Sequence, residues 1–487
     1  MTRFRKWLIL VHRYLGIALA LLFLTWFVSG IAMIYARDMP RLTPATRLER
    51  LPALDLARVR LTALEAAERA GLVTRPVRIT LLTIQDRPAY RFAGAPPVTI
   101  FADTGEVMRP ASERDAVAIA ARFIDLPASA VRHLRVLDRA DQWTIAARRQ
   151  LPLHKIAVDD HAGTELYVSA ALGEVVVQTT RGSRALAWVA AIPHWLYFAP
   201  LRLNDGLWRQ VILWTSGLGV ISVLAGLVLA VTQFKVAYEG VMRWHYVTGV
   251  AIGVFTLTWV FSGLLSMEPW LWAASDSEGP SIAQALSGGP VDLSVFPVID
   301  RGDWNRALPG RIVKEIDFRR LQGDPYFVAR GPDRAPLLVA TKPLRVVEEP
   351  FATAAILSRV RAANPGVAIV DAELLPSYDL YYYDRDRLAP LPVLRIRFED
   401  PDRTWAYVDP RLNEVVARFT RRERVQRWLY HGLHSLDFPF WYDSRAWDVG
   451  MIALLSGGAT LSAIGVLIGW RRLQRIFARR PGPIGPG

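Results

Sequence analysis

HRYLGIALALLFLTWFVSG, from His12 to Gly30, is followed 233 residues later by HYVTGVAIGVFTLTWVFSG, from His245 to Gly263. Each stretch begins with a histidine, has a glycine four residues later and closes on LTW-x-x-SG. Each is also apolar for about 20 residues, the length at which an α-helix crosses the hydrocarbon core of a bilayer. The pair therefore predicts two membrane-spanning helices that belong to an internal two-fold repeat.

Composition supports a protein with membrane and globular parts, because 52% of the 487 residues are hydrophobic and the mean hydropathy is +0.19. The formal net charge of +14 comes from scattered arginines and from clusters beside apolar stretches. Since these clusters lack the basic and aromatic pattern of a nucleic-acid-binding module, we expect no nucleic-acid partner. The sequence has no cysteine, which excludes disulfides, thiolate metal sites and covalent attachment of haem through cysteine.

Four membrane spans are expected, and the lipid bilayer is their expected partner. Lys and Arg residues gather at the N-terminus, in the short connection between the second and third spans, and after the fourth span. By the positive-inside rule, both termini and that connection face the cytoplasm. The four spans are residues 1–35, 207–232, 244–267 and 447–470, and residues 471–487 form a cytoplasmic basic tail. The basic residues are Arg3, Arg5, Lys6, Lys235, Arg243, Arg471, Arg472, Arg475, Arg479 and Arg480.

The two long connections, residues 36–206 and 268–446, then lie outside the cytoplasm as α+β regions. Periodic apolar residues predict helices at 59–71, 113–124 and 351–363, and strands through Ile79, Tyr90 and Phe101. A strand, a tight turn and Glu-Val recur at 98–107, 165–175 and 405–415, which predicts hairpins. We expect small units in each region, with one helix packed on an antiparallel sheet.

The repeat extends to a second pair of histidines, because His194 matches His434 at an offset of 240 residues. Two crossings in each half give the halves the same orientation, so an axis along the membrane normal can relate them. This symmetry pairs His12 with His245 near the cytoplasmic face, and His194 with His434 on the outer side.

Two neutral imidazoles from facing helices can supply both axial ligands of a low-spin haem. The paired histidines therefore accommodate two bis-histidine haems, one near each membrane face, although a lone histidine at a helix end is usually an interfacial residue. His431, whose repeat partner is Ala191, could replace His434 as a ligand, stand at the substrate-side edge of the haem, or lie on the surface. No repeat partners exist for His133, His154 and His161, which are expected on solvated surface or in contact with a ligand.

Trp26 and Trp259 match each other and are each followed by a Ser-Gly pair three residues later. One interpretation is an interfacial tryptophan belt with glycines for close helix packing. The other is that these residues form a wall of the outer haem site.

The histidine and TW-x-x-SG motifs, the endings of the form D-x-x-x-G-E-V and the segment WLYHGLHSLDF resemble the PepSY-associated transmembrane proteins. This bacterial inner-membrane family includes iron-regulated membrane proteins and ferric-siderophore reductases, and the resemblance runs from His12 to about Trp470. It implies haem b bound at His12, His194, His245 and His434, and electron transfer to a periplasmic ferric siderophore that releases iron as Fe(II). Because no dinucleotide fingerprint is found, we expect a separate electron donor, either a quinol or a cytoplasmic flavoprotein.

Two other functions compete with a membrane haem oxidoreductase. The first is a non-enzymatic PepSY-type envelope protein that binds or regulates a peptidase or a sensor. The second is a transporter, which is disfavoured because no carboxylate or broken helix marks a substrate path within the spans. No acid–base or nucleophilic catalytic residue is expected.

Overall fold

The computed structural model describes residues 3–36, 38–72, 78–94, 97–234, 236–269, 279–332 and 335–478. The chain divides into two compact units, which are described separately. A helical unit is formed by Met1–Met39, Ser183–Ala274 and Arg422–Gly487. A sheet unit is formed by Pro40–Gly182 and Ser275–Arg421.

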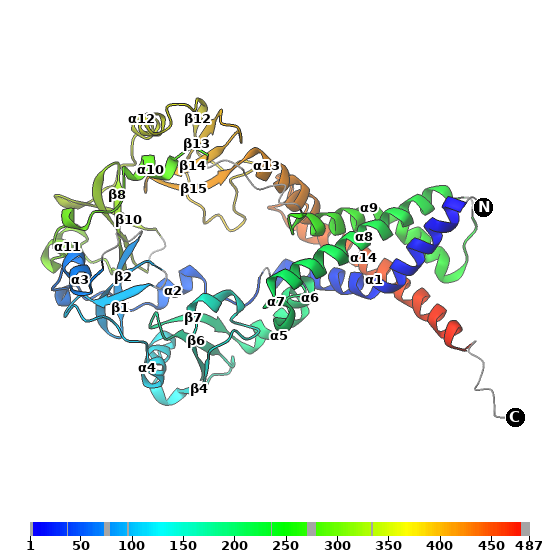
Figure 1. Cartoon of the computed structure of the whole chain (residues 1–487), viewed down its shortest axis with the longest axis horizontal. Helices are drawn as coiled ribbons and strands as arrows, with labels where there is room; N and C mark the ends of the chain where they lie inside the picture. The colour runs from blue at the N-terminus through cyan, green and yellow to red at the C-terminus, as the bar shows by residue number, and fades with distance from the viewer. Residues whose placement is uncertain are drawn as a thin grey trace. The chain divides into compact units, whose positions relative to one another are not determined.

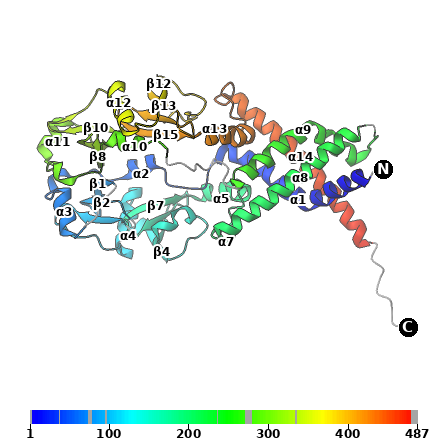
Figure 2. The same cartoon turned by 45° about the horizontal axis from the view of Figure 1, so that its top comes forward.

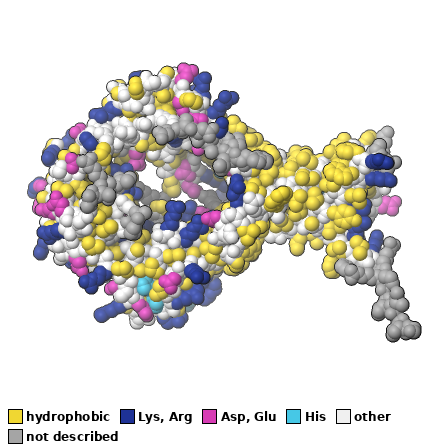
Figure 3. Space-filling model, viewed as in Figure 1, with side chains coloured by type: hydrophobic (Ala, Val, Ile, Leu, Met, Phe, Trp, Pro, Cys, Tyr) yellow, Lys and Arg dark blue, Asp and Glu magenta, His cyan; other side chains and the backbone are white. Residues whose placement is uncertain are grey.

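The helical unit contains four long helices that run alongside one another in both views (Figures 1 and 2). They are α1 (Arg3–Ala36), α8 (Asp205–Thr232), α9 (Gly240–Leu265) and α14 (Arg445–Ala478). Among the described residues, these four are long and apolar enough to cross a membrane. Hydrophobic side chains cover most of their visible surface (Figure 3), as lipid contact requires. The four predicted apolar spans are confirmed as helices, and the chain is a multi-pass membrane protein.

Small residues allow these helices to approach closely. A Cβ atom on Gly219 of α8 would lie 2.8 Å from the side chain of Val260 in α9. One on Gly458 of α14 would lie 2.5 Å from the side chain of Phe27 in α1. Within a bilayer, such close van der Waals packing is a main source of helix association.

Each of α8 and α14 is preceded by short helical segments. Before α8 lie α5 (Arg181–Val189), α6 (Ala191–His194) and α7 (Ala199–Arg202). Before α14 lie α13 (Arg421–Arg427) and a π-helical turn (Trp428–Gly432). His194 is the last residue of α6, and His434 lies two residues after the π-helical turn.

The sheet unit is built on a seven-stranded antiparallel sheet of order β11-β10-β9-β8-β1-β2-β3. One face is covered by α3 (Ala63–Arg69) and α11 (Arg301–Ala307), with buried Trp304 packed against Phe327. The strands are β1 (Ile79–Ile84), β2 (Arg87–Phe92), β3 (Val98–Phe101), β8 (Glu315–Leu321), β9 (Asp324–Arg330), β10 (Leu337–Thr341) and β11 (Leu344–Val346).

Two four-stranded antiparallel sheets share one strand order and each packs against a helix. The first consists of β4 (Val131–Leu137), β5 (Leu153–Val158), β6 (Glu165–Ser169) and β7 (Glu174–Thr179), with α4 (Glu113–Ile124). The second consists of β12 (Ile369–Leu375), β13 (Val393–Phe398), β14 (Trp405–Asp409) and β15 (Glu414–Phe419), with α12 (Thr353–Ala363) and α10 (Ile282–Ser287). The predicted helices at 113–124 and 351–363, and the hairpins at 165–175 and 405–415, are confirmed.

Three predictions about the sheet unit need correction. The helix expected at 59–71 is only α3, because Thr62 caps its start in a capping box with Glu65 and the helix ends at Arg69. At 98–107, the predicted hairpin forms but is short, because β3 ends at Phe101 and its partner segment is held by one antiparallel bridge from Ile100 to Val107. The two long connections also share one sheet, because β1 pairs with β8. Sequence periodicity cannot reveal such pairing between distant strands.

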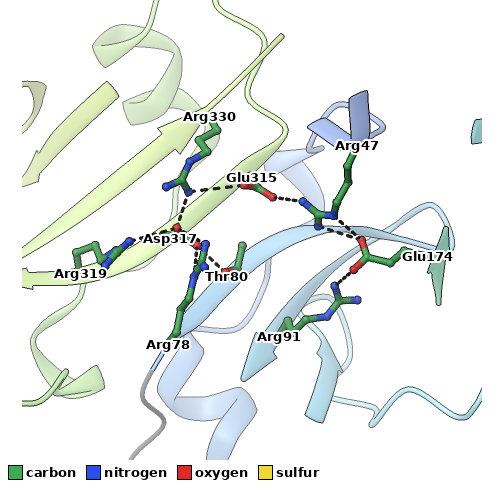
Figure 4. A network of polar contacts seen from close by, with 9 residues as sticks. All are labelled: Arg47, Arg78, Thr80, Arg91, Glu174, Glu315, Asp317, Arg319 and Arg330. Atoms are coloured by element: carbon green, nitrogen blue, oxygen red, sulfur yellow. Dashed lines mark hydrogen bonds and ion pairs between the residues drawn. The ribbon is translucent and has the colours of Figure 1, made fainter. Parts of the chain in front are cut away.

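Buried ion pairs join the sheets on the second face of the seven-stranded sheet (Figure 4). Asp317 of β8 is fully buried and accepts hydrogen bonds from Thr80 at 2.5 Å, Arg330 at 2.5 Å and Arg78 at 2.8 Å. Burial would raise the pKa of Asp317, but the two guanidinium groups and the Thr80 hydroxyl outweigh it and hold that pKa below the usual range.

A second set of ion pairs in Figure 4 surrounds Glu174 at the start of β7. Its carboxylate accepts hydrogen bonds from Arg91 at 2.5 Å and from Arg47 of α2 (Pro44–Arg50) at 3.0 Å. Burial again opposes the charged form, and the two arginines again lower the pKa of Glu174. Since Arg47 also pairs with Glu315, the contacts link β7 to the seven-stranded sheet.

Candidate functional site

The predicted inner histidines face each other inside the helical unit. His12 of α1 and His245 of α9 have ring centroids 6.1 Å apart, with an angle of 36° between the ring planes. Helices α1 and α9 each pack mainly against α8 and α14. The two rings therefore approach across the interior of the four-helix bundle.

Helix α8 fixes the orientation of His12. The Nδ1 atom of His12 lies 2.9 Å from the carbonyl oxygen of Ser222. Because a carbonyl only accepts, Nδ1 carries the proton and Nε2 keeps its lone pair, as a metal ligand requires. One turn further along, Gly226 leaves space for the ring, since a Cβ there would lie 2.6 Å from Cε1 of His12.

The ring of His245 has fewer hydrogen-bond partners than that of His12. Its Nδ1 atom is buried and has no hydrogen-bond partner among the residues that the structure describes. Within that part of the chain, no hydrogen bond to Nδ1 therefore determines which ring nitrogen of His245 carries the proton, in contrast to His12.

The predicted outer histidines also form a facing pair. The ring centroids of His194 and His434 lie 6.0 Å apart, with the planes at 68°. Buried serines hold both rings: Ser29 Oγ lies 3.2 Å from Nδ1 of His194, and Ser262 Oγ lies 3.0 Å from Nδ1 of His434.

The serine hydrogen bonds determine the tautomer of the outer histidines. Ser29 donates its hydroxyl proton to the carbonyl of Thr25 at 2.6 Å, and Ser262 donates to the carbonyl of Trp259 at 2.9 Å. Each Oγ must then accept a proton from the neighbouring Nδ1, which leaves Nε2 free as a ligand atom.

The outer pair is neutral at neutral pH. Burial lowers the pKa of His194 to about 4. Burial, together with the neighbouring His194 and His431, lowers the pKa of His434 to about 3. Neutral imidazole is the form that ligates a metal.

Tryptophan side chains hold the backbone beside His434. The indole N–H groups of Trp259, Trp447 and Trp441 donate to the carbonyls of His434, Ser435 and Leu436 at 2.7, 2.8 and 2.7 Å, respectively. Trp259 is buried, which fits a wall of the outer site better than an exposed belt.

Trp26 lies beside the other outer histidine. Its carbonyl is 3.2 Å from Nδ1 of His194, whereas its own indole nitrogen is buried without a partner among the described residues. Trp26 therefore contacts the outer site through its backbone carbonyl, whereas Trp259 does so through its indole N–H.

His431 is exposed and does not take the place of His434 opposite His194. Its ring lies against Tyr430, at a centroid distance of 4.8 Å, and Tyr430 stacks on His434 at 5.3 Å. Of the three sequence-based alternatives, the geometry favours a position at the edge of the outer site.

The remaining histidines lie in the sheet unit. The prediction of solvated surface is wrong for His154, which is 5% exposed. It bonds the carbonyl of Ala111 at 2.9 Å through Nε2 and the ring of His133 at 3.1 Å through Nδ1. His133 also pairs with Glu113 at 3.2 Å, while His161 is exposed. These bonds attach the start of α4 to its sheet, and no three-residue metal site occurs among the described side chains.

The site thus combines predicted and unpredicted residues. Matching within the repeat pointed to the four histidines, and its two apolar stretches contain Ser29 and Ser262, whose hydrogen bonds to the outer histidines were not predicted. Ser222 and Gly226 carried no sequence signal, because their contacts depend on how α8 packs against α1.

A family model described as PepSY-associated TM region matches residues 9–294 of the chain. The match includes α1, α8 and α9, and with them His12, His194 and His245, whereas His434 lies beyond it. No curated protein matches the chain.

Proposed function

The chain belongs to the PepSY-associated TM region family, and from this premise we propose that it is a haem-containing oxidoreductase that reduces ferric siderophores. Its proposed location is the bacterial inner membrane, with reduction on the periplasmic side. The observation that carries the proposal is the arrangement of four histidines from distant parts of the sequence as two facing pairs.

The donor set fits two haem b groups, one held by His12 and His245 and the other by His194 and His434. The centroid separations of 6.1 and 6.0 Å leave room for one metal ion bound at about 2 Å from a nitrogen of each ring. Haem, when bound, supplies one-electron redox chemistry. The chain's own residues orient three of the four ligands, because Ser222, Ser29 and Ser262 leave Nε2 unprotonated in His12, His194 and His434, respectively.

The proposed substrate matches this site because the reaction requires only an electron. Hydroxamate and catecholate oxygens are hard anionic ligands that bind Fe(III) far more tightly than Fe(II). A single electron therefore loosens the iron without breaking the chelator. This is consistent with a site that consists of imidazoles and aromatic walls.

Charge supports the proposed orientation, with both termini in the cytoplasm. Lys and Arg side chains gather at the end of the helical unit that carries the N-terminus (Figure 3). Lys235, Arg479 and Arg480, which contributed to this prediction, lie outside the described residues. We further propose that the two halves are related by a two-fold axis along the membrane normal. Electrons would come from a separate donor, either a quinol or a flavoprotein.

The haem-to-protein ratio of the detergent-solubilised chain tests the function. We expect about two haems per chain, with sharp low-spin bands in the oxidised and dithionite-reduced spectra. His12→Ala and His245→Ala should each remove one haem and leave the other, whereas His161→Ala, at an exposed position, should remove none.

Two outcomes would contradict the proposal. Retention of both haems in either inner-histidine variant would disprove the pairing. A ratio near zero in protein made with adequate haem would favour the non-enzymatic PepSY-type envelope protein that regulates a peptidase or a sensor.

A further inference from the structure

The segment before the outer ligand His434 has an unusual backbone. Residues Trp428–Gly432 form a π-helical turn, which inserts an extra residue into the helix. Such turns are rare and occur frequently at functional sites. A buried ion pair holds this one, because Arg427 donates to the carboxylate of Asp437 at 3.0 Å and to its carbonyl at 3.1 Å.

The π-helical turn places three aromatic rings in a row. Tyr430 stacks on the ligand His434, at a centroid distance of 5.3 Å and an angle of 28°. The exposed ring of His431 meets Tyr430 edge to face, at 4.8 Å and 62°. The row therefore runs from the outer histidine pair to a solvent-accessible imidazole.

The predicted repeat offers a comparison in which the matching histidine lacks this row of rings. In the repeat register, Tyr430 and His431 correspond to Ala190 and Ala191, which are both fully buried. His194 is nevertheless held opposite His434 in the same way, by a buried serine. Packing does not account for His431 either, because its side chain faces solvent.

We infer that Tyr430 and His431 form the acceptor side of the outer site, where His431 donates a hydrogen bond to an oxygen of the ferric chelate. This inference rests on the proposed function. Tyr430 is a positioning residue, because it stacks on His434 and holds the ring of His431.

The reaction on this side is a one-electron transfer. A haem held by His194 and His434 would supply one electron, which would reduce the chelated Fe(III) to Fe(II) without a bond to the protein. Because Fe(II) neutralises less of the charge on the chelate oxygens, a hydrogen bond from His431 becomes stronger as the electron arrives. An interaction that strengthens along the reaction lowers the barrier rather than only improving binding.

Stopped-flow reoxidation of the dithionite-reduced, haem-loaded full chain tests this assignment. The probes are ferric desferrioxamine B, a hydroxamate chelate, and ferricyanide, a small oxidant that does not need chelate recognition. His431→Ala should slow reoxidation by the hydroxamate about tenfold, the loss expected for one hydrogen bond to a charged group. In the same variant, the rate of reoxidation by ferricyanide, the haem content and the reduction potentials should stay at wild-type values.

Variants of Tyr430 separate positioning from recognition. Tyr430→Phe keeps the stacked ring and should behave as wild type. Tyr430→Ala should slow the hydroxamate reaction and shift the potential of the outer haem, because His434 loses the ring that covers it. His161→Ala serves as the matched control for loss of an exposed histidine.

An unchanged hydroxamate rate in His431→Ala would overturn the inference, and so would an equal decrease with both oxidants. These outcomes leave the proposed function intact if the wild type binds haem. Wild-type protein without haem would instead overturn the proposed function, and this inference with it.

Discussion

Replacing Gly226 of α8 by alanine is expected to displace His12 and to weaken the inner haem site. The added Cβ would lie 2.6 Å from Cε1 and 2.9 Å from Nδ1 of His12. Since carbon atoms pack best at about 3.5–4.0 Å, the ring would have to move by about 1 Å. Such a movement would break the 2.9 Å hydrogen bond from Nδ1 to the carbonyl of Ser222.

The magnitude follows from three contributions. Overpacking costs about 1–3 kcal/mol, and the lost hydrogen bond costs about 1 kcal/mol. Alanine gains about 1 kcal/mol over glycine within a helix, which offsets part of this. The net effect of about 1–3 kcal/mol corresponds to roughly 5- to 150-fold weaker haem retention at the inner site.

Transfer of haem from the purified protein to an excess of apomyoglobin measures this retention. Gly226→Ala should lose one haem quickly and keep the outer one at the wild-type rate. Gly217→Ala is the matched control, because it lies in the same helix and its Cβ would meet no atom within 4 Å. Wild-type retention of both haems in Gly226→Ala would refute the role of His12 as an oriented ligand.

Other changes test the outer site and the sheet unit. Ser262→Ala leaves Nδ1 of His434 without its hydroxyl acceptor and should speed loss of the outer haem about 5- to 10-fold; an unchanged rate in the same transfer assay would contradict this. Asp317→Asn removes the buried charge that pairs with Arg330 and should destabilise the sheet unit by about 3–5 kcal/mol, seen as faster limited proteolysis at neutral pH. Because the pKa of Asp317 is lowered on folding, its stabilisation is present in full above the usual carboxyl pKa and declines as the pH falls from about 4 through the lower folded pKa, so the difference between wild type and variant should shrink in that range. His154→Ala breaks a buried hydrogen bond and should lower the thermal unfolding temperature, whereas the exposed His161→Ala should change it little, and equal effects would count against a structural role for His154.

The sequence was sufficient to predict the spans and the two histidine pairs. Apolar length determines which segments can cross a bilayer, and matching within the repeat identified His12 with His245 and His194 with His434. The local α+β elements were also predictable, because α4 and the β6–β7 hairpin depend on short-range periodicity.

Features that depend on distant contacts could not be predicted. The pairing of β1 with β8 joins segments more than 200 residues apart, and no local pattern specifies it. The burial of His154 follows from the helix start that covers it. The tautomer of His12 likewise depends on a backbone carbonyl of α8, which any residue type could have supplied.

The two sides of the outer site differ although their histidines match. Ser29 and Ser262 hold His194 and His434 in the same way, so the orientation of the histidines is shared by both halves. The surroundings diverge, because a tyrosine covers His434 where the other half has a buried alanine. A site that only stored haem would gain nothing from this difference. A site that passes electrons to a bulky chelate needs one open and recognisable side, and the exposed imidazole of His431 lies on the side of His434.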